Sequence, residues 1–194
     1  MPDAGQQEDA GSQGGSFSLP PGCPTPAPEP VPGQTIAIQS INVVTSEIVL
    51  RNVATTPQTL ALGVQGWQWC YWPMYYAVAA SSSSTVELEP GETYAFIAVK
   101  NQSGPVTLFP DEGEMAIYPT TGVFDEYEYM QTFVTWGEIQ AFRESYAVQK
   151  GLWVFGQRIQ IQPGHAGFIA TGPTNLAAGY TSARAECLSA PPNR

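Results

Sequence analysis

Hydrophobic and polar positions along this chain form short runs separated by turn residues. Most runs alternate with a period of two and are rich in β-branched and aromatic side chains, and Gly, Pro, Ser or Asn lie between them. This pattern predicts strands at residues 35–44, 47–53, 60–62, 66–72, 85–88, 93–99, 114–118, 129–136, 158–161 and 166–170. Seven or more short strands spaced roughly 8–12 residues apart are typical of an all-β sandwich.

One segment has the spacing of a helix instead. Phe142, Tyr146 and Gln149 recur at four- and three-residue intervals. Lys150 suits the negative end of the helix dipole, and Gly151 is a natural stop. We therefore expect one short helix near the C-terminal end of the chain.

The densest aromatic stretch of the chain runs from residue 66 to residue 76. Alternate side chains of a strand here share one face: Trp67, Trp69 and Tyr71. The side chains between them share the other face: Gln68, Cys70 and Trp72. Only Gln68 is strongly polar, so we expect a central strand that is covered on most of both faces and ends at Pro73. The predicted core contains Trp67, Trp69, Ile97 and Trp136.

Composition divides the chain into three parts. Residues 1–33 contain eight prolines, six glycines and no Lys or Arg, which predicts an acidic tether that is not folded. Residues 34–188 form the predicted sandwich domain, and residues 189–194 form a tail.

Charge and hydropathy restrict the partners. The net charge is −10, and the seven Lys and Arg residues are scattered, so we expect no nucleic-acid partner. No apolar run approaches the ~18 residues of a membrane span. The first residues resemble a mature exported sequence behind an added methionine. We expect a location outside the cell or in the cell envelope, with a lipid on an upstream cysteine as one route of attachment.

A series of short motifs resembles the lamin-tail domain, an immunoglobulin-like β-sandwich. The motifs occur in this order: a strand ending at Asn52, Thr59-Leu60, Gly66-Trp67, Leu88-Glu89-Pro90-Gly91-Glu92, Gly113-Glu114, and Trp136-Gly137. Two further groups are similar to features of bacterial exported versions: Trp67-Gln68-Trp69-Cys70, and Arg143-Glu144-Ser145 followed by Ala147-Val148, Gly151 and Trp153. The resemblance covers residues 35–175, with a longer approach to Gly66. It implies an immunoglobulin-like sandwich and a non-catalytic module of the cell surface, without cofactor or active site.

The three cysteines predict one disulfide bond and one free thiol in an oxidising compartment. We favour a bond between Cys70 and Cys187, which would pin the C-terminal tail to the aromatic strand. A bond between Cys23 and Cys187 is the close alternative, and it would join the two termini.

Few residues suggest chemistry. His165 is the only histidine and no Gly-x-Ser-x-Gly motif is present, so we interpret it as a turn residue bonded to backbone or water. One histidine and three separated cysteines make no local zinc site. The acidic groups at residues 111–114 and 125–128 match no calcium-binding repeat, and we interpret them as solvated loops.

The aromatic residues after the central strand are better candidates for binding: Trp72, Tyr75 and Tyr76. They can stack on sugars or anchor a protein, or else pack beneath the serine-rich loop at residues 81–84. A non-catalytic surface module that binds protein or surface polysaccharide is our leading hypothesis. A carbohydrate-binding module is second, and a hydrolase is third.

Overall fold

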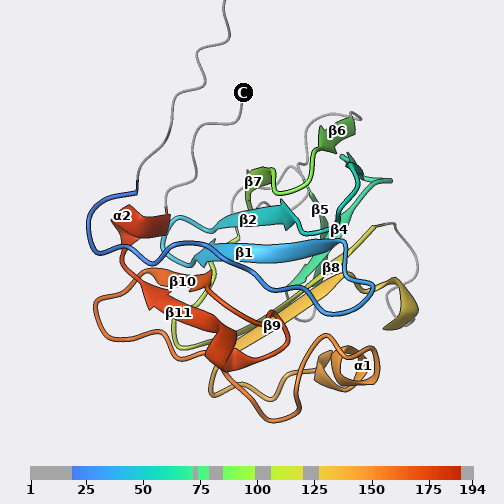
Figure 1. The fold of residues 1–194 in the computed structure, drawn as a ribbon. Helices are drawn as coiled ribbons and strands as arrows, with labels where there is room; N and C mark the ends of the chain where they lie inside the picture. The colour runs from blue at the N-terminus through green and yellow to red at the C-terminus, as the bar shows by residue number, and fades with distance from the viewer. Residues whose placement is uncertain (1–18, 72–73, 79–84, 99–105, 120–126, 189–194) are drawn as a thin grey trace, which may run out of the picture.

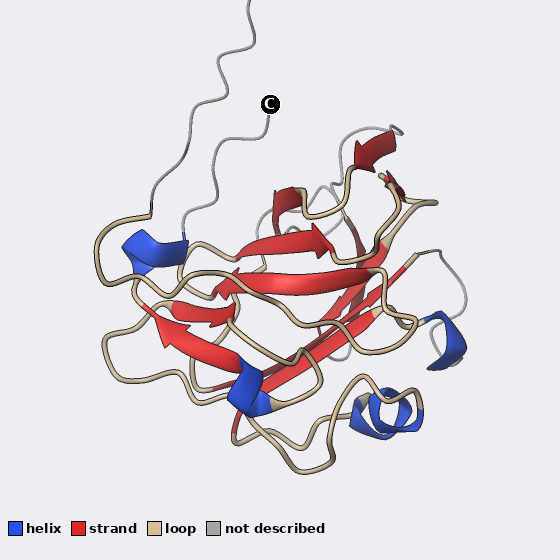
Figure 2. Ribbon diagram, in the orientation of Figure 1, coloured by secondary structure: helices blue, strands red, loops and turns tan. Residues whose placement is uncertain are grey.

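The computed structural model describes residues 19–71, 74–78, 85–98, 106–119 and 127–188. It confirms the prediction of an all-β sandwich with a short helix near the C-terminal end. Two antiparallel sheets lie one behind the other in Figure 1, and the short helices lie at the periphery in Figure 2.

Eleven strands build the described part of the fold. The first sheet has the order β11-β10-β1-β2-β7: Tyr180–Ala183, Gly167–Ala170, Ile36–Asn42, Glu47–Asn52 and Thr93–Ile97. The second sheet has the order β5-β4-β8-β9: Met74–Ala77, Gln68–Tyr71, Glu112–Tyr118 and Thr132–Gly137. A separate pair is formed by β3 and β6: Gln58–Ala61 and Thr85–Leu88. The helices are η1, α1, η2 and α2: Tyr127–Tyr129, Glu144–Gln149, Ala177–Gly179 and Ala185–Leu188.

The core lies between the two large sheets. Trp69 faces Phe96 across the interface with ring centroids 6.4 Å apart, and Trp136 faces Phe168 at 5.6 Å. Trp67, Trp69 and Trp136 are buried as predicted. The prediction for Ile97 is wrong, because 43% of it is exposed. It follows Phe96 on β7, and successive side chains of a strand point to opposite faces, so only one of the two can reach the core.

The aromatic stretch forms two strands rather than one. β4 lies inside the second sheet, with Trp69 opposite Tyr76 of β5 and opposite Ile117 of β8. Gln68 is buried as well, and its side-chain amide donates to the carbonyl oxygens of Val64 and Gly66. This pairing satisfies the one strongly polar side chain, so β4 can be covered on both faces.

Asn52, the residue that ends β2, joins two loops at one end of the sandwich, the β2–β3 loop and the β6–β7 turn. It is fully buried, and its Nδ2 donates to the carbonyl oxygens of Thr56 (2.9 Å) and Leu88 (2.8 Å). Its Oδ1 accepts a hydrogen bond from the Ala54 N–H (2.9 Å). Its own carbonyl accepts one from Gly91, which has a φ of 84° in the turn between β6 and β7. Two of the motifs noted in the sequence therefore meet at this asparagine.

A second pair of motifs meets at Trp136. The ring of Trp136 lies directly against the backbone of Gly113, where an added Cβ would lie 2.2 Å from ring atom Cζ2. Gly137 follows at a φ of 67°, and a Cβ there would overlap the carbonyl of Asp111. Both glycines are required by close approach, since any side chain would push the strands β8 and β9 apart.

Part of the expected tether packs against the domain. The Ala27 N–H donates to the Ala170 carbonyl, and the Glu29 N–H donates to the Gly172 carbonyl, both at 2.9 Å. Gln34 accepts a hydrogen bond of 2.7 Å from the Thr174 hydroxyl. The sequence boundary at residue 34 therefore differs from the packed boundary, because backbone hydrogen bonds hold this segment where side-chain hydrophobicity does not predict packing.

The favoured disulfide bond is wrong, and the alternative is present. Cys23 and Cys187 form a disulfide bond with a Cα–Cα distance of 5.3 Å and a sequence separation of 164. Cys187 lies on α2, which packs on β1 and β10 of the first sheet, beside Ile169. Cys70 is a free, buried thiol on β4 of the second sheet. Cys70 and Cys187 therefore belong to different layers and cannot pair.

The helical elements differ in detail from expectation. α1 is shorter than the predicted helix, and α2 and β11 have no predicted counterpart. The ammonium group of Lys150 donates to the carbonyl oxygens of Glu128 (2.5 Å) and Met130 (2.6 Å), and so ties α1 to η1. In the region of 158–161, only Ile159 forms a bridge, a parallel one with Trp136. None of the helices in the described ranges has the length and hydropathy needed to cross a membrane.

Candidate functional site

Two buried ionisable side chains, those of Cys70 and Glu114, lie on the outer face of the second sheet. Cys70 pairs with Tyr75 on one side and with Ala116 on the other, and Glu114 pairs with Thr135. Directly paired residues of antiparallel strands point to the same face, and so do residues two apart on one strand. All five side chains therefore lie on one face, away from the first sheet.

Residues 139–158, here named the cover segment, lie over this face. The segment contains α1, and its Trp153 ring packs edge-on against Phe133 with centroids 5.8 Å apart. Ala147 and Leu152 are buried with it. The second sheet is thus enclosed between the first sheet and the cover segment, which explains why polar side chains on its outer face are buried.

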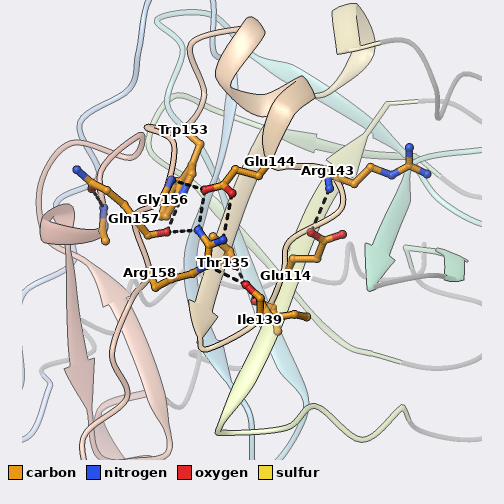
Figure 3. A network of polar contacts seen from close by, with 11 residues as sticks. Glu114, Thr135, Ile139, Arg143, Glu144, Trp153, Gly156, Gln157 and Arg158 are labelled. Carbon is orange, nitrogen blue, oxygen red and sulfur yellow. Dashed lines mark hydrogen bonds and ion pairs between the residues drawn. The ribbon is translucent and has the colours of Figure 1, made fainter.

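Glu144 and Arg158 form an ion pair inside the cover segment (Figure 3). The two guanidinium nitrogens donate to the two carboxylate oxygens at 2.6 and 3.0 Å. Oε1 of Glu144 accepts a further hydrogen bond of 2.7 Å from the Gly156 N–H. The side chain of Glu144 is 5% exposed and that of Arg158 is 18% exposed. This two-pronged arrangement is the strongest geometry available to a carboxylate and an arginine.

Arg158 also holds backbone at both ends of the cover segment. Its Nε donates to the Ile139 carbonyl at 3.3 Å, and its Nη1 donates to the Gln157 carbonyl at 2.6 Å. The next residue, Ile159, exchanges backbone hydrogen bonds with β9 through Thr135 and Gly137. The ion pair therefore closes the loop around α1 and fixes it to the sheet.

Glu114 holds the beginning of α1. Arg143 occupies the N-cap position, and α1 has no side-chain cap of its own. Oε2 of Glu114 accepts a hydrogen bond of 3.1 Å from the Arg143 N–H, so β8 supplies the cap that the helix lacks. Among the described residues, Oε1 has no hydrogen bond of normal geometry.

The ionisation of Glu114 follows from this environment. Burial raises its pKa from an ordinary 4.5 to about 7. The backbone N–H groups of Arg143 and Phe142 and the charge of Arg158 oppose the rise, whereas the charge of Glu144 adds to it. A neutral carboxylic acid is therefore accessible near neutral pH in this part of the protein.

Cys70 is the neighbour of Glu114 on the same face. Burial raises the pKa of its thiol from 9.0 to about 12, and the guanidinium group of Arg143 opposes the rise. A thiol that stays protonated is a poor nucleophile and a poor metal ligand. Cys70 therefore behaves as a small buried hydrophobic residue.

The three aromatic binding candidates have different fates. Tyr76 is buried and its ring lies 4.6 Å from that of Trp69, so it is part of the core and unavailable to a ligand. Tyr75 is partly exposed, and the Arg143 guanidinium lies over its ring at 5.1 Å. Trp72 lies outside the described residues. Tyr75 is thus the candidate that keeps an accessible surface.

His165 lies just after a turn, as predicted, but its partner is a side chain. Its Nδ1 shares a hydrogen bond of 2.8 Å with the Ser182 hydroxyl, which also accepts one from the Gln162 N–H. No carboxylate bonds to the other ring nitrogen within the described ranges, so a Ser-His-acid triad is not assembled there.

The two acidic groups do not converge in the described structure. Glu112 is exposed whereas Glu114 is buried, and residues 125 and 126 lie outside the described ranges. No cluster of three or more potential metal ligands occurs in the parts of the chain that are placed.

Comparison with protein-family models gave no match, and comparison with curated proteins gave none either. The polar residues of the cover segment and its sheet face were not singled out as a site from the sequence: Glu114, Glu144 and Arg158. One signal is readable in retrospect. Glu112 and Glu114 share one face of the strand with Ala116 and Tyr118, and Glu114 is the acid next to the apolar residues, which favours its burial over that of Glu112.

Proposed function

We propose that this protein is a non-catalytic, exported binding or structural module of the cell surface, of the lamin-tail type. The observation that supports this most is the use of its buried ionisable groups. Glu144, Arg158 and Glu114 all bind the backbone of the cover segment, which is the arrangement of a structural fastener. Catalytic groups instead point at a place that a substrate can occupy.

The disulfide bond supports export. A bond between Cys23 and Cys187 forms and persists in oxidising compartments, whereas thiols stay reduced in the cytosol. Attachment by a lipid on an upstream cysteine belongs to the same proposal. Surface labelling of intact cells that produce the full-length protein tests the export, and mass spectrometry of the cell-associated protein tests the lipid. Labelling only after lysis would contradict export.

The lamin-tail assignment gains support from the motif residues. Asn52 joins the turn at Gly91, and Gly113 packs under Trp136, so each of these motifs has a structural reason in this fold. Trp67 donates its N–H to the Ala61 carbonyl at 2.7 Å, and a Cβ on Gly66 would lie 2.1 Å from the same oxygen. These are the constraints that keep such residues fixed within a family.

A carbohydrate-binding role is the second candidate, and one cluster favours it. Tyr75, Arg143 and Tyr146 come together at the rim of the cover segment, with the guanidinium 5.1 Å and 5.8 Å from the two ring centroids. Phe142 beside them is 58% exposed. Aromatic rings next to an arginine can stack on a sugar ring and bind its hydroxyl or carboxylate groups.

A glycan array with two tyrosine variants separates the candidates. If Tyr75 is a sugar platform, Tyr75→Ala loses glycan binding, and Tyr129→Ala, which changes a tyrosine 40% exposed on η1, keeps it. Binding by neither the parent protein nor the variants favours a protein partner. Turnover of ester, peptide or glycoside substrates that disappears in a folded His165→Ala variant would overturn the non-catalytic assignment.

A further inference from the structure

The two ends of the domain leave it at one place. On the N-terminal side, residues 27–29 lie parallel to residues 170–173, the stretch that begins at the end of β10 and precedes β11 in sequence. On the C-terminal side, α2 follows β11 directly. Cys23 and Cys187 lie at this place with Cα atoms 5.3 Å apart, and every strand of the sandwich falls between them in sequence. The disulfide bond therefore encloses the whole sandwich in one covalent loop.

From this connectivity we propose that the domain is a load-bearing link whose length does not change under tension. A force that enters before Cys23 and leaves after Cys187 passes through the disulfide bond. The sheets lie off this path, so they carry no part of the load and stay folded. Only the chain outside the loop, before Cys23 and after Cys187, can then extend.

Without the disulfide bond, the non-covalent contacts that hold the two ends of the domain resist this force only weakly. The segment from Ala27 to Glu29 is held by separate backbone hydrogen bonds to Ala170, Gly172 and Thr174. The two ends start side by side, so a force that separates them loads these bonds one after another and peels the segment away. Leu188 and the few apolar residues around it hold the other end. A reduced domain should therefore open at low force.

Release of the loop would lengthen the link greatly. A sequence separation of 164 residues corresponds to about 540–590 Å of extended chain. The same domain therefore keeps a fixed length under tension when oxidised and gains this length when it is reduced and pulled open. This inference concerns tension alone, and it holds whichever ligand the proposed surface module binds.

Single-molecule force spectroscopy on the full chain, fused at both ends to marker domains of known length, tests the proposal. The oxidised protein should give marker unfolding steps and no step from the sandwich. The same molecules after reduction should give an added length of about 540–590 Å. Their opening force should lie below that of marker domains whose terminal strands are loaded in shear.

Two results would overturn the proposal. One is the long step in the oxidised protein, which would place the sandwich on the load path. The other is a reduced protein that resists as strongly as the markers, which would show that the sheets bear the load without the bond. The variant Cys23→Ser/Cys187→Ser should behave like the reduced parent protein. Reduction of already folded molecules keeps the test decisive if that variant folds poorly.

Discussion

Two buried carboxylates fasten the same cover segment to the same sheet, and they do so differently. Glu144 faces the guanidinium group of Arg158 through two hydrogen bonds and receives a third from the backbone. Glu114 faces backbone N–H groups, and no arginine bonds to its oxygens among the described contacts. Both carboxylates are almost completely buried. The difference between them is therefore one of charge compensation rather than of burial.

This comparison shows what a buried acid needs in order to hold a loop. A guanidinium group neutralises the charge of the buried carboxylate, and its two hydrogen bonds fix the geometry of the pair. Backbone N–H groups compensate only partly, so burial dominates and Glu114 has a pKa of about 7. The first fastener should fail when either partner is removed, and the second should respond to pH.

The largest effect is expected from removing the guanidinium group. The variant Arg158→Met leaves the carboxylate of Glu144 buried without its partner, which typically costs about 3–5 kcal/mol of unfolding free energy. Chemical denaturation followed by tryptophan fluorescence measures the loss. The double variant Glu144→Gln/Arg158→Met removes both charges and should recover much of the stability. A double variant as unstable as the single one would mean that Arg158 acts through its contacts with Ile139 and Gln157 instead.

The next effect is a dependence of stability on pH that comes from Glu114. Its pKa is about 7 in the folded protein and near its ordinary 4.5 in the unfolded chain, so the folded state binds the extra proton between these values. Stability from this group is fully present below pH 4.5 and is lost as the pH rises through 7. The full change is about 3 kcal/mol.

The variant Glu114→Gln isolates this contribution. Its side chain does not titrate, so the variant should not lose unfolding free energy between pH 5 and pH 8 as the parent does. The stability difference between parent and variant therefore changes by up to about 3 kcal/mol over that range. Urea denaturation at a series of pH values measures it. The variant Glu112→Gln, which changes an exposed carboxylate on the same strand, is the matched control and should follow the parent. Parallel curves for Glu114→Gln and the parent would show that Glu114 does not titrate in this range.

The same contrast explains how much of the molecule the sequence predicts. Strands such as β2 and β6 follow from β-branched residues and turns, because these are local properties. The burial of Trp69 and Trp136 also follows, because large aromatic residues in alternating segments need a core. The exposure of Ile97 does not, since hydrophobicity alone does not say which face of an edge strand meets the other sheet.

Long-range pairing accounts for the rest. The choice of Cys23 over Cys70 depends on which layer each cysteine joins, and no local pattern contains that information. The polar partners Glu144, at the start of α1, and Arg158, beyond its end, are 14 residues apart, so they pair only after the cover segment has folded. Backbone hydrogen bonds that hold a proline-rich segment, as at Ala27, leave no side-chain pattern to read.

A smaller effect tests whether the surroundings of Glu114 are dry. Cys70 lies on the same face, and its thiol has a pKa of about 12 because of burial. An alkylating reagent at pH 8 should therefore leave folded protein unmodified and label one thiol per chain once the protein unfolds without reduction. Mass spectrometry counts the labels. Fast labelling of folded protein would indicate solvent at this face, and the same solvent would lower the pKa of Glu114.

The smallest effect concerns the outer rim of the cover segment, where an arginine makes cation–π contacts with two tyrosine rings. The Arg143 guanidinium lies 5.1 Å from the Tyr75 ring of β5 and 5.8 Å from the Tyr146 ring of α1. Each such contact at a partly exposed position is worth about 0.5–1 kcal/mol. The variant Tyr146→Leu keeps a large apolar side chain on the helix and removes the ring, so it should lose no more than this amount. A double-mutant cycle with Arg143→Met measures the coupling directly, because the two single losses exceed the double loss only when the residues interact. A coupling energy near zero would show that the contact between Arg143 and Tyr146 does not help to hold the cover segment at this rim.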